Sequence, residues 1–237
     1  MDLKTQGNKL RELLGLEYAP VAVSFRPTAP EGVERVEASG PSSCSYWKLA
    51  AEGRTFYTEA ADHLNCTIGA HTHNVEMPPE KAAELQSMVG EMVKLNYIRM
   101  EEVPGIPKRD APFGVAVYSP LADATEPPDA VIVRGNARQT MLLTEAATRA
   151  NIGNGPAAMG RPTCAMIPAA MQSEQGVSSL GCIGNRVYTG LSEDELYYTV
   201  PGPKLPELVD SLETICDANR ALETFHREHA AAVAAAQ

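Results

Sequence analysis

Apolar residues recur along several segments of the chain with the period of a helix. Leucines three and four positions apart, with charges between them, predict an amphipathic helix over residues 3–14 that ends at Gly15. The same spacing over 205–236 predicts a long C-terminal helix. A third apolar face, opened by a proline pair, predicts a helix over 79–95, and we expect this face to pack on a sheet.

Short apolar runs predict the strands, which we place at 20–25, 55–58, 113–119, 130–133 and 177–182. The runs over 113–119 and 130–133 show little alternation, which is typical of strands covered on both faces. A helical pattern follows over 137–150. Together these elements predict an α/β (or α+β) fold, with a mixed sheet flanked by helices and a long C-terminal helix.

Two polar segments have local signatures of their own. Residues 63–73 show neither a helical nor an alternating pattern, so we expect a loop there. Ser192 followed by Glu195 has the spacing of a capping box, which predicts the first turn of a helix.

The length of 237 residues and the hydrophobic content of 44% are enough for a full core, so we expect one domain over 1–237. A two-lobed domain with a hinge near 151–160 is the alternative, because that segment is rich in glycine. It lacks the signatures of a nucleotide phosphate loop.

The formal net charge of −10 would repel a phosphate backbone, and no basic run reverses it locally, so nucleic acid is not an expected partner. The sequence contains no run of about 18 apolar residues, which a membrane-spanning helix would need. The first 16 residues mix charges with leucines, unlike a signal peptide. We therefore expect a cytoplasmic protein.

The five cysteines carry the candidate chemistry, since cytoplasmic thiols stay reduced and serve as ligands, nucleophiles or core residues. Cys44 and Cys164 fall in the first turns of expected helices, where the helix dipole lowers the pKa of a thiol. Cys66 and Cys182 precede glycine-containing turns that leave amide N–H groups free to bond sulfur, as iron–sulfur sites require. Cys216 lies on an apolar helical stripe and is expected to be structural.

The spacing of these cysteines leaves other interpretations open. The gaps between them are long, and none forms the Cys-x-x-Cys pair typical of zinc or ferredoxin sites. Core packing alone therefore remains an alternative for all of them.

Histidines near Cys66 indicate a rival metal site. His63, His71 and His73 lie within eleven residues of chain, and imidazole with thiolate suits zinc or copper. His63 is also a candidate acid/base group.

Two arginines adjoin the later cysteines in the sequence. Arg161 precedes Cys164 and Arg186 follows Cys182, where a guanidinium can stabilise a thiolate or bind a carboxylate or phosphate. A surface salt bridge is the alternative for both.

The strings from Cys164 to Pro168 and from Gly181 to Arg186 resemble the family named domain of unknown function 169. The resemblance covers nearly the whole chain, and its most specific part is Gly-Cys-x-Gly-x-Arg. It implies a stand-alone cytoplasmic microbial protein in which the cysteine strings are family features, and it implies no activity. The residues that carry over are Cys44, Cys66, Cys164, Cys182 and Arg186.

The leading hypothesis is a [4Fe–4S] cluster bound by Cys44, Cys66, Cys164 and Cys182, with Arg161 and Arg186 beside it. Four ligands favour a redox or sensing role, whereas an iron left open by one cysteine would favour lyase-type chemistry on a small molecule. The expected partner is accordingly a small molecule or a redox protein.

Three alternatives belong to other functional classes. A thiol enzyme would use Cys182 or Cys66 as nucleophile, His63 as base and Arg186 as anion clamp. A zinc or copper protein would use the histidines with Cys66. A non-enzymatic module would close 153–160 over a small ligand. Apolar helices at both ends also make a homo-oligomer a prediction.

Overall fold

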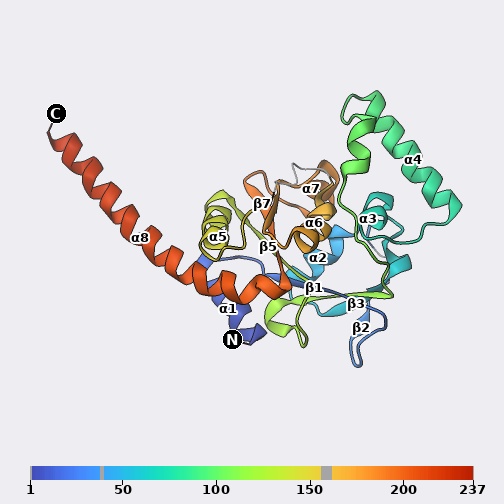
Figure 1. The fold of residues 1–237 in the computed structure, drawn as a ribbon, viewed down its shortest axis with the longest axis horizontal. Coiled ribbons are helices and arrows are strands. Elements are labelled where there is room, and N and C mark those ends of the chain that lie inside the picture. Colours follow the sequence, from blue (N-terminus) through green and yellow to red (C-terminus); the bar gives the residue numbers. More distant parts are fainter. Residues whose placement is uncertain (1, 38–39, 156–161, 237) are drawn as a thin grey trace.

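A computed structural model describes residues 2–37, 40–155 and 162–236 of the chain (Figure 1). Within these residues seven strands form one sheet in the order β2-β3-β4-β1-β5-β7-β6. β2 pairs with β3 in parallel and every other neighbouring pair is antiparallel, so the expected mixed sheet is confirmed. The strands are β1 (Val21–Arg26), β2 (Glu34–Arg35), β3 (Phe56–Glu59), β4 (Val115–Pro120), β5 (Ala130–Asn136), β6 (Val177–Ser179) and β7 (Glu195–Pro201).

Both faces of the sheet are covered by helices, as the unbroken apolar runs predict. The α-helices are α1 (Leu3–Leu14), α2 (Cys44–Ala51), α3 (Thr67–Thr72), α4 (Pro79–Lys94), α5 (Ala137–Arg149), α6 (Met166–Ser173), α7 (Ile183–Thr189) and α8 (Leu205–Ala235). Short 3₁₀ helices join them in the described parts of the chain: η1 (Ala60–His63), η2 (Met100–Gly105), η3 (Leu121–Asp123), η4 (Thr163–Ala165) and η5 (Gly202–Lys204).

Alternate residues of the central strand enter two separate cores. Val21 and Val23 of β1 belong to a core with α2 and α6, whereas Ala22 faces the core formed with α1, α5 and α8. The same alternation divides Ile132 from Val131 in β5. The cysteine-bearing helices α2 and α6 thus lie on one face of the sheet, and the helices at the chain ends lie on the other.

The expectation that the helix over 79–95 packs on the sheet is wrong. α4 has no buried residue, and it projects from the body as a green arm whose base lies near α3 (Figure 1). An amphipathic period shows that one face of a helix is apolar, but it does not show what covers that face. The outer half of α8 also stands clear of the body, with residues 224–236 exposed.

The capping box predicted at Ser192 does not begin a helix. Glu195 is the first residue of β7, although the N–H of Ser192 does donate to its carboxylate at 3.0 Å. The following run from Tyr197 to Val200 is aromatic and β-branched, which favours a strand. Pairing with β5 along seven residues then decides the conformation.

The predicted hinge lies only partly within the described residues, since 156–160 fall outside them. The described part is tied to the sheet, because Asn154 bridges to Gly176 and accepts a hydrogen bond from the Tyr198 hydroxyl at 3.0 Å. A two-lobed arrangement stays a prediction. In the part of the chain that the structure describes, no helix combines the length and apolar character needed to span a membrane.

Candidate functional site

Each of the four candidate cysteines lies at the start of a helical segment. Cys44 is the first residue of α2, and Cys66 and Cys182 are the N-cap residues of α3 and α7. Cys164 lies in η4, which runs directly into α6. The first N–H groups of a helix lack intrahelical acceptors, and this end carries the positive part of the dipole. Four separate positions in the sequence thus share one local environment.

Tertiary packing brings these four helix starts together. α2 packs against α7, and α3 packs against η4. The four thiols are near enough for the ionisation of one to affect the others. Burial is the largest cause of the raised pKa of Cys164, and repulsion from Cys66, Cys44 and Cys182 raises this pKa further. In the same way, Cys66 and Cys182 raise the pKa of Cys44, and Cys182 raises that of Cys66. Every pair among the four is therefore electrostatically coupled.

Backbone amides and hydroxyl groups surround the sulfur atoms. The Sγ of Cys66 accepts a hydrogen bond from the N–H of Gly69 at 3.3 Å, and the Sγ of Cys182 accepts one from Asn185 at 3.4 Å. The Sγ of Cys44 lies 3.2 Å from the hydroxyl of Ser42. Hydrogen bonds of this kind tune thiolate ligands in iron–sulfur proteins.

Gly69 allows α3 to approach the start of α2 closely. A Cβ atom at this position would lie 2.5 Å from the Ser43 hydroxyl oxygen and 3.3 Å from the Cys66 sulfur.

The prediction of a loop over 63–73 is only partly correct, because Thr67–Thr72 forms a helix. Six residues are too few for a recognisable period, and contacts with α4, η1 and η4 support the helix.

Burial, and not the helix dipole, dominates the acidity of the thiols. Burial raises the pKa of Cys44 to about 11, although the nearby Ser42 hydroxyl and Asn185 amide act to lower it. Burial also raises the pKa of Cys66 and of Cys164. The lowered pKa expected at Cys44 and Cys164 is thus wrong, since both side chains are only 7% exposed and desolvation disfavours the thiolate. A bound metal would reverse this preference, because it deprotonates coordinating thiols.

Two buried polar side chains next to the cysteines lack ordinary hydrogen bonds within the described residues. Both amide atoms of Asn185 are without a partner at 1% exposure, although the amide lies near enough to lower the pKa of Cys44. The hydroxyl of Thr67, directly after Cys66, is likewise buried without a partner. Such groups are costly unless a bonding partner reaches them, and sulfide and thiolate are acceptors.

His63 is fully buried and engaged on both sides of its ring. Its Nδ1 lies 3.0 Å from the Ser43 hydroxyl, and its Nε2 lies 2.9 Å from the Thr58 hydroxyl. Burial holds the pKa of His63 well below its usual value, so the ring is neutral at physiological pH. His63 therefore contacts Ser43, the residue before Cys44, and its two ring nitrogens bond hydroxyl groups and not a cysteine.

The histidines proposed for zinc or copper are only partly brought together. The rings of His63 and His73 lie 5.5 Å apart, and the Nδ1 of His73 donates to the carbonyl of Gly69 at 2.9 Å. His71 is half-buried, and the charge of Lys108 acts together with burial to lower its pKa. Among the described residues, no three His, Cys, Asp or Glu side chains are grouped closely enough to hold a single metal ion.

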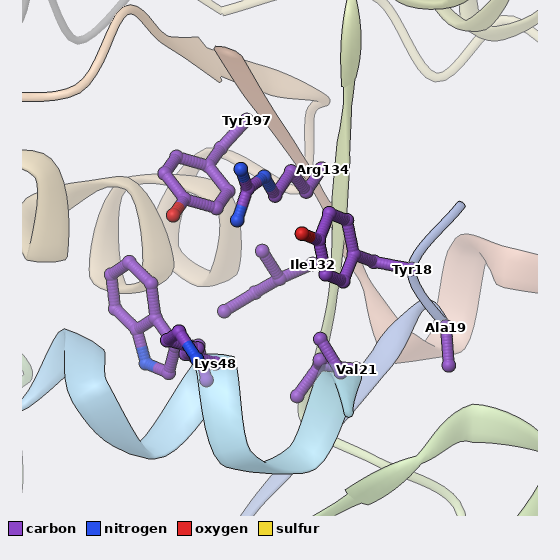
Figure 2. Close-up of a pocket in the computed structure, with 9 residues that line it drawn as sticks. Tyr18, Ala19, Val21, Lys48, Ile132, Arg134 and Tyr197 are labelled. Carbon is purple, nitrogen blue, oxygen red and sulfur yellow. The ribbon is translucent and has the colours of Figure 1, made fainter. Parts of the chain in front are cut away.

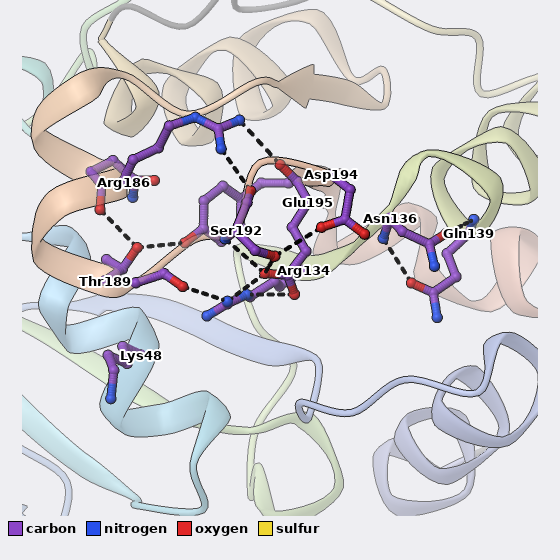
Figure 3. Close-up of polar contacts among 12 residues, drawn as sticks. Lys48, Arg134, Asn136, Gln139, Arg186, Thr189, Ser192, Asp194 and Glu195 are labelled. Atoms are coloured by element: carbon purple, nitrogen blue, oxygen red, sulfur yellow. Dashed lines mark hydrogen bonds and ion pairs between the residues drawn. The ribbon is translucent and has the colours of Figure 1, made fainter.

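Arg186 is directed at backbone carbonyl groups around α7. Its guanidinium donates to the carbonyls of Ser192 at 2.7 Å and of Glu195 at 3.2 Å, and also to that of Leu180 (Figure 3). These contacts hold the segments before and after α7, so they support a positioning role for Arg186 beside Cys182. Arg161 lies outside the described residues.

A second arginine fixes the other end of α7. Arg134 of β5 donates to the Glu195 carboxylate at 2.9 Å through Nε and to the carbonyl of Gly190, the C-cap of α7, at the same distance (Figure 3). The sequence does not predict this pair, because its members are far apart in the chain and the local pattern at Glu195 indicates only a capping box with Ser192.

The neighbouring pocket positions α2 and is too small for a ligand. Trp47 of α2 meets the ring of Tyr197 edge-on at 5.8 Å. Tyr197 lies close to Arg134 and Ile132 at the edge of the pocket (Figure 2). The cavity between them has a volume of about 10 Å³, which accommodates one water molecule at most. The contact between Trp47 and Tyr197 packs α2, which begins at Cys44, against β7.

Comparisons with known proteins confirm the family resemblance. The family model described as DUF169, uncharacterised ArCR, matches residues 9–211, a range that includes all four candidate cysteines. The uncharacterised protein MJ0308 of Methanocaldococcus jannaschii is 28% identical over 226 residues, which cover 90% of this chain and 94% of that protein. No solved structure matches the chain significantly.

Proposed function

Because the chain belongs to the DUF169 family, whose description assigns no activity, we propose a function from its own residues: it binds a [4Fe–4S] cluster through Cys44, Cys66, Cys164 and Cys182. One observation carries the proposal. Four cysteines far apart in the sequence begin four helical segments that converge on one face of the sheet, where their thiols are mutually coupled.

The arrangement favours a cluster over a single zinc ion. Zinc draws four sulfurs to about 2.3 Å from one centre, and no such close group exists among the described residues. In a cubane each thiolate binds a different iron, so the four ligands lie farther apart. Four sulfurs that influence one another's ionisation without lying in contact fit the wider spacing of the ligands of a cubane cluster.

The surroundings also suit the negative charge of such a cluster. Four helix starts direct their positive ends and free N–H groups toward it, and Gly69 and Asn185 already donate to cysteine sulfurs. The buried amide of Asn185 is placed to donate a further bond. This diffuse positive charge does not depend on Arg186, whose guanidinium is bonded to carbonyl groups.

Two of the cysteines leave one side of the site accessible. Cys44 and Cys164 are buried, whereas Cys66 and Cys182 are partly exposed. Ile183, which follows Cys182, is 67% exposed. Ligation by all four cysteines leaves no open iron, so we favour electron transfer or sensing over a lyase-type reaction. We expect such a protein in the reducing cytoplasm, where its free thiols remain available.

The thiol-enzyme alternative has less support from the contacts. Burial raises the pKa of Cys66, whereas a nucleophilic cysteine needs a lowered one. The expected base, His63, has both ring nitrogens occupied by hydroxyl groups. The expected anion clamp, Arg186, is bonded to carbonyls.

Anaerobic purification followed by absorption spectroscopy and metal analysis tests the proposal. We expect a broad band near ~400 nm with about four iron and four sulfide per chain. Replacing any one of the four cysteines with serine should lower the iron content. Cys216→Ser is the matched control, because Cys216 is also buried but lies in α8 on the other face of the sheet.

The opposite results are equally definite. A folded protein that contains about one zinc and no sulfide would replace the cluster with a mononuclear site. A folded, metal-free protein obtained under anaerobic conditions after supply of iron and sulfide would contradict the proposal.

A further inference from the structure

An open groove lies beyond the histidine pair, where β1 ends and the chain approaches β4. Its volume of about 430 Å³ is in the range of small-molecule sites. It is lined by Phe25, Arg26, Pro27, Arg109, Pro112 and Phe113, together with Gly114. None of these residues takes part in the cysteine site.

Aromatic rings and a guanidinium form the walls of the groove. The rings of Phe25 and Phe113 meet edge to face with their centroids 5.1 Å apart. The guanidinium of Arg109 lies 3.8 Å above the Phe25 ring and 5.4 Å from that of Phe113. Stacking holds the planar fork of Arg109 in one orientation.

The two arginines of the groove differ in how their charge is balanced. Arg26 pairs with Glu126 and Asp129, each at 3.2 Å. Arg109 donates to the carbonyl of Ala111 at 2.9 Å, and no carboxylate within the described residues forms an ion pair with it. Burial lowers the pKa of Arg109, and the carboxylates of Asp129 and Asp110, which act on it without forming an ion pair, partly offset this effect.

We infer that this groove binds a small aromatic carboxylate. The carboxylate complements the planar fork of Arg109, and the ligand ring fits against the partly exposed Phe113, since Phe25 is only 8% exposed beneath the guanidinium. The protein carries a formal net charge of −10, so attraction of an anion here depends on this local cation.

The groove adjoins the cysteine site through the buried histidines. Phe25 contacts His73 with ring centroids 5.8 Å apart, and Phe113 meets His63 at 5.6 Å. His63 in turn bonds Ser43, the residue before Cys44. The groove is thus connected to the cysteine site through the contact of Phe113 with His63 and the hydrogen bond of His63 with Ser43. Ligand binding in the groove requires no iron, so it stands or falls independently of the cluster.

Isothermal titration calorimetry with benzoate tests the inference on anaerobically purified protein whose iron content is measured in the same sample. Benzoate should bind saturably, and Arg109→Met should weaken it at least tenfold. Lys108→Met is the matched control, because it removes one positive charge from the adjacent position, which does not line the groove. Arg109→Lys keeps the charge but loses the fork, and it provides a second variant should the methionine variant misfold.

Two further probes separate charge from shape. Benzamide keeps the ring without the charge and inorganic phosphate keeps charge without the ring, so both should bind at least tenfold more weakly than benzoate. Phosphate that binds as tightly as benzoate would overturn the inference, and so would equal losses in Arg109→Met and Lys108→Met. No saturable heat with up to about 10 mM benzoate would also overturn it.

Discussion

The side-chain hydroxyl of Thr163 accepts a hydrogen bond at 2.5 Å from the backbone N–H of Cys182. Thr163 is fully buried and directly precedes Cys164, so this one contact joins the segment of Cys164 to the segment of Cys182. It also satisfies an N–H at the start of α7 that no helical carbonyl can reach.

Thr163→Val should therefore damage both stability and the cysteine site. The change keeps the side-chain shape but leaves the N–H of Cys182 without its acceptor, which costs about 1–3 kcal/mol. We expect a lower midpoint of thermal unfolding and a reduced iron content per chain. Thr163→Ser should restore both, and Thr224→Val, whose hydroxyl bonds the Arg220 carbonyl in the exposed outer part of α8, should change neither. Normal iron content in Thr163→Val would show that this contact does not position Cys182.

Gly69→Ala should disturb the site through a steric clash. Its Cβ atom would approach the Ser43 hydroxyl oxygen to 2.5 Å and the Cys66 sulfur to 3.3 Å, so one of them must move. We expect less iron per chain. Gly90→Ala is the matched control, because nothing lies within 4 Å of a Cβ at this position in α4. That change should raise stability by about 0.5–1 kcal/mol and leave iron content unaltered. Equal iron in the two variants would argue against close packing at Gly69.

The pair of Arg134 and Glu195 should make stability depend on pH in the acid range. Burial alone would raise the pKa of Glu195, but hydrogen bonds from Arg134 and Ser192 outweigh it and lower the pKa to about 2. Because the folded value lies below the ordinary 4.5, the stabilisation is complete above pH 4.5 and is lost as the pH falls toward 2. Glu195→Gln should thus cost about 2–3 kcal/mol at pH 7 and much less near pH 3.

Chemical denaturation at several pH values measures this difference. Glu223→Gln is the control, because Glu223 pairs with Arg138 and Arg227 on the exposed part of α8, where ion pairs contribute little. A cost of Glu195→Gln that stays the same from pH 7 to pH 3 would contradict the assignment.

His73 should produce a second loss of stability at milder acidity. Burial lowers its pKa from 6.5 to about 4, so the unfolded chain binds a proton in this window and the folded protein does not. Stability is complete above pH 6.5 and falls as the pH drops to 4, by on the order of 3 kcal/mol. His73→Leu should remove this part of the dependence and leave the part due to His63, whose pKa is also lowered by burial.

Denaturation curves between pH 7 and pH 4 test this expectation. His226→Leu, in the exposed half of α8, should leave the slope unchanged. An identical slope in His73→Leu and the wild type would indicate that His73 is accessible to protons in the folded state.

Elements whose formation depends on near neighbours in the chain could be predicted from the sequence. The periods over 3–14 and 205–236 correspond to α1 and α8, and the unbroken runs correspond to β4 and β5, covered on both faces. The sequence also located Cys44 and Cys164 at helix starts, because capping residues and apolar spacing act within one or two turns of chain.

The positions of these elements and the surroundings of their side chains depend on tertiary packing, which the sequence pattern does not show. Tertiary packing placed α4 away from the sheet, turned the segment after Ser192 into a strand through pairing with β5, and gave Arg186 carbonyl partners. It also reversed the expected acidity of Cys44 and Cys164, because burial by distant segments outweighs the dipole of their own helices. Local periodicity and capping are properties of adjacent residues, whereas desolvation, strand pairing and ion pairing depend on residues that meet only when the chain folds.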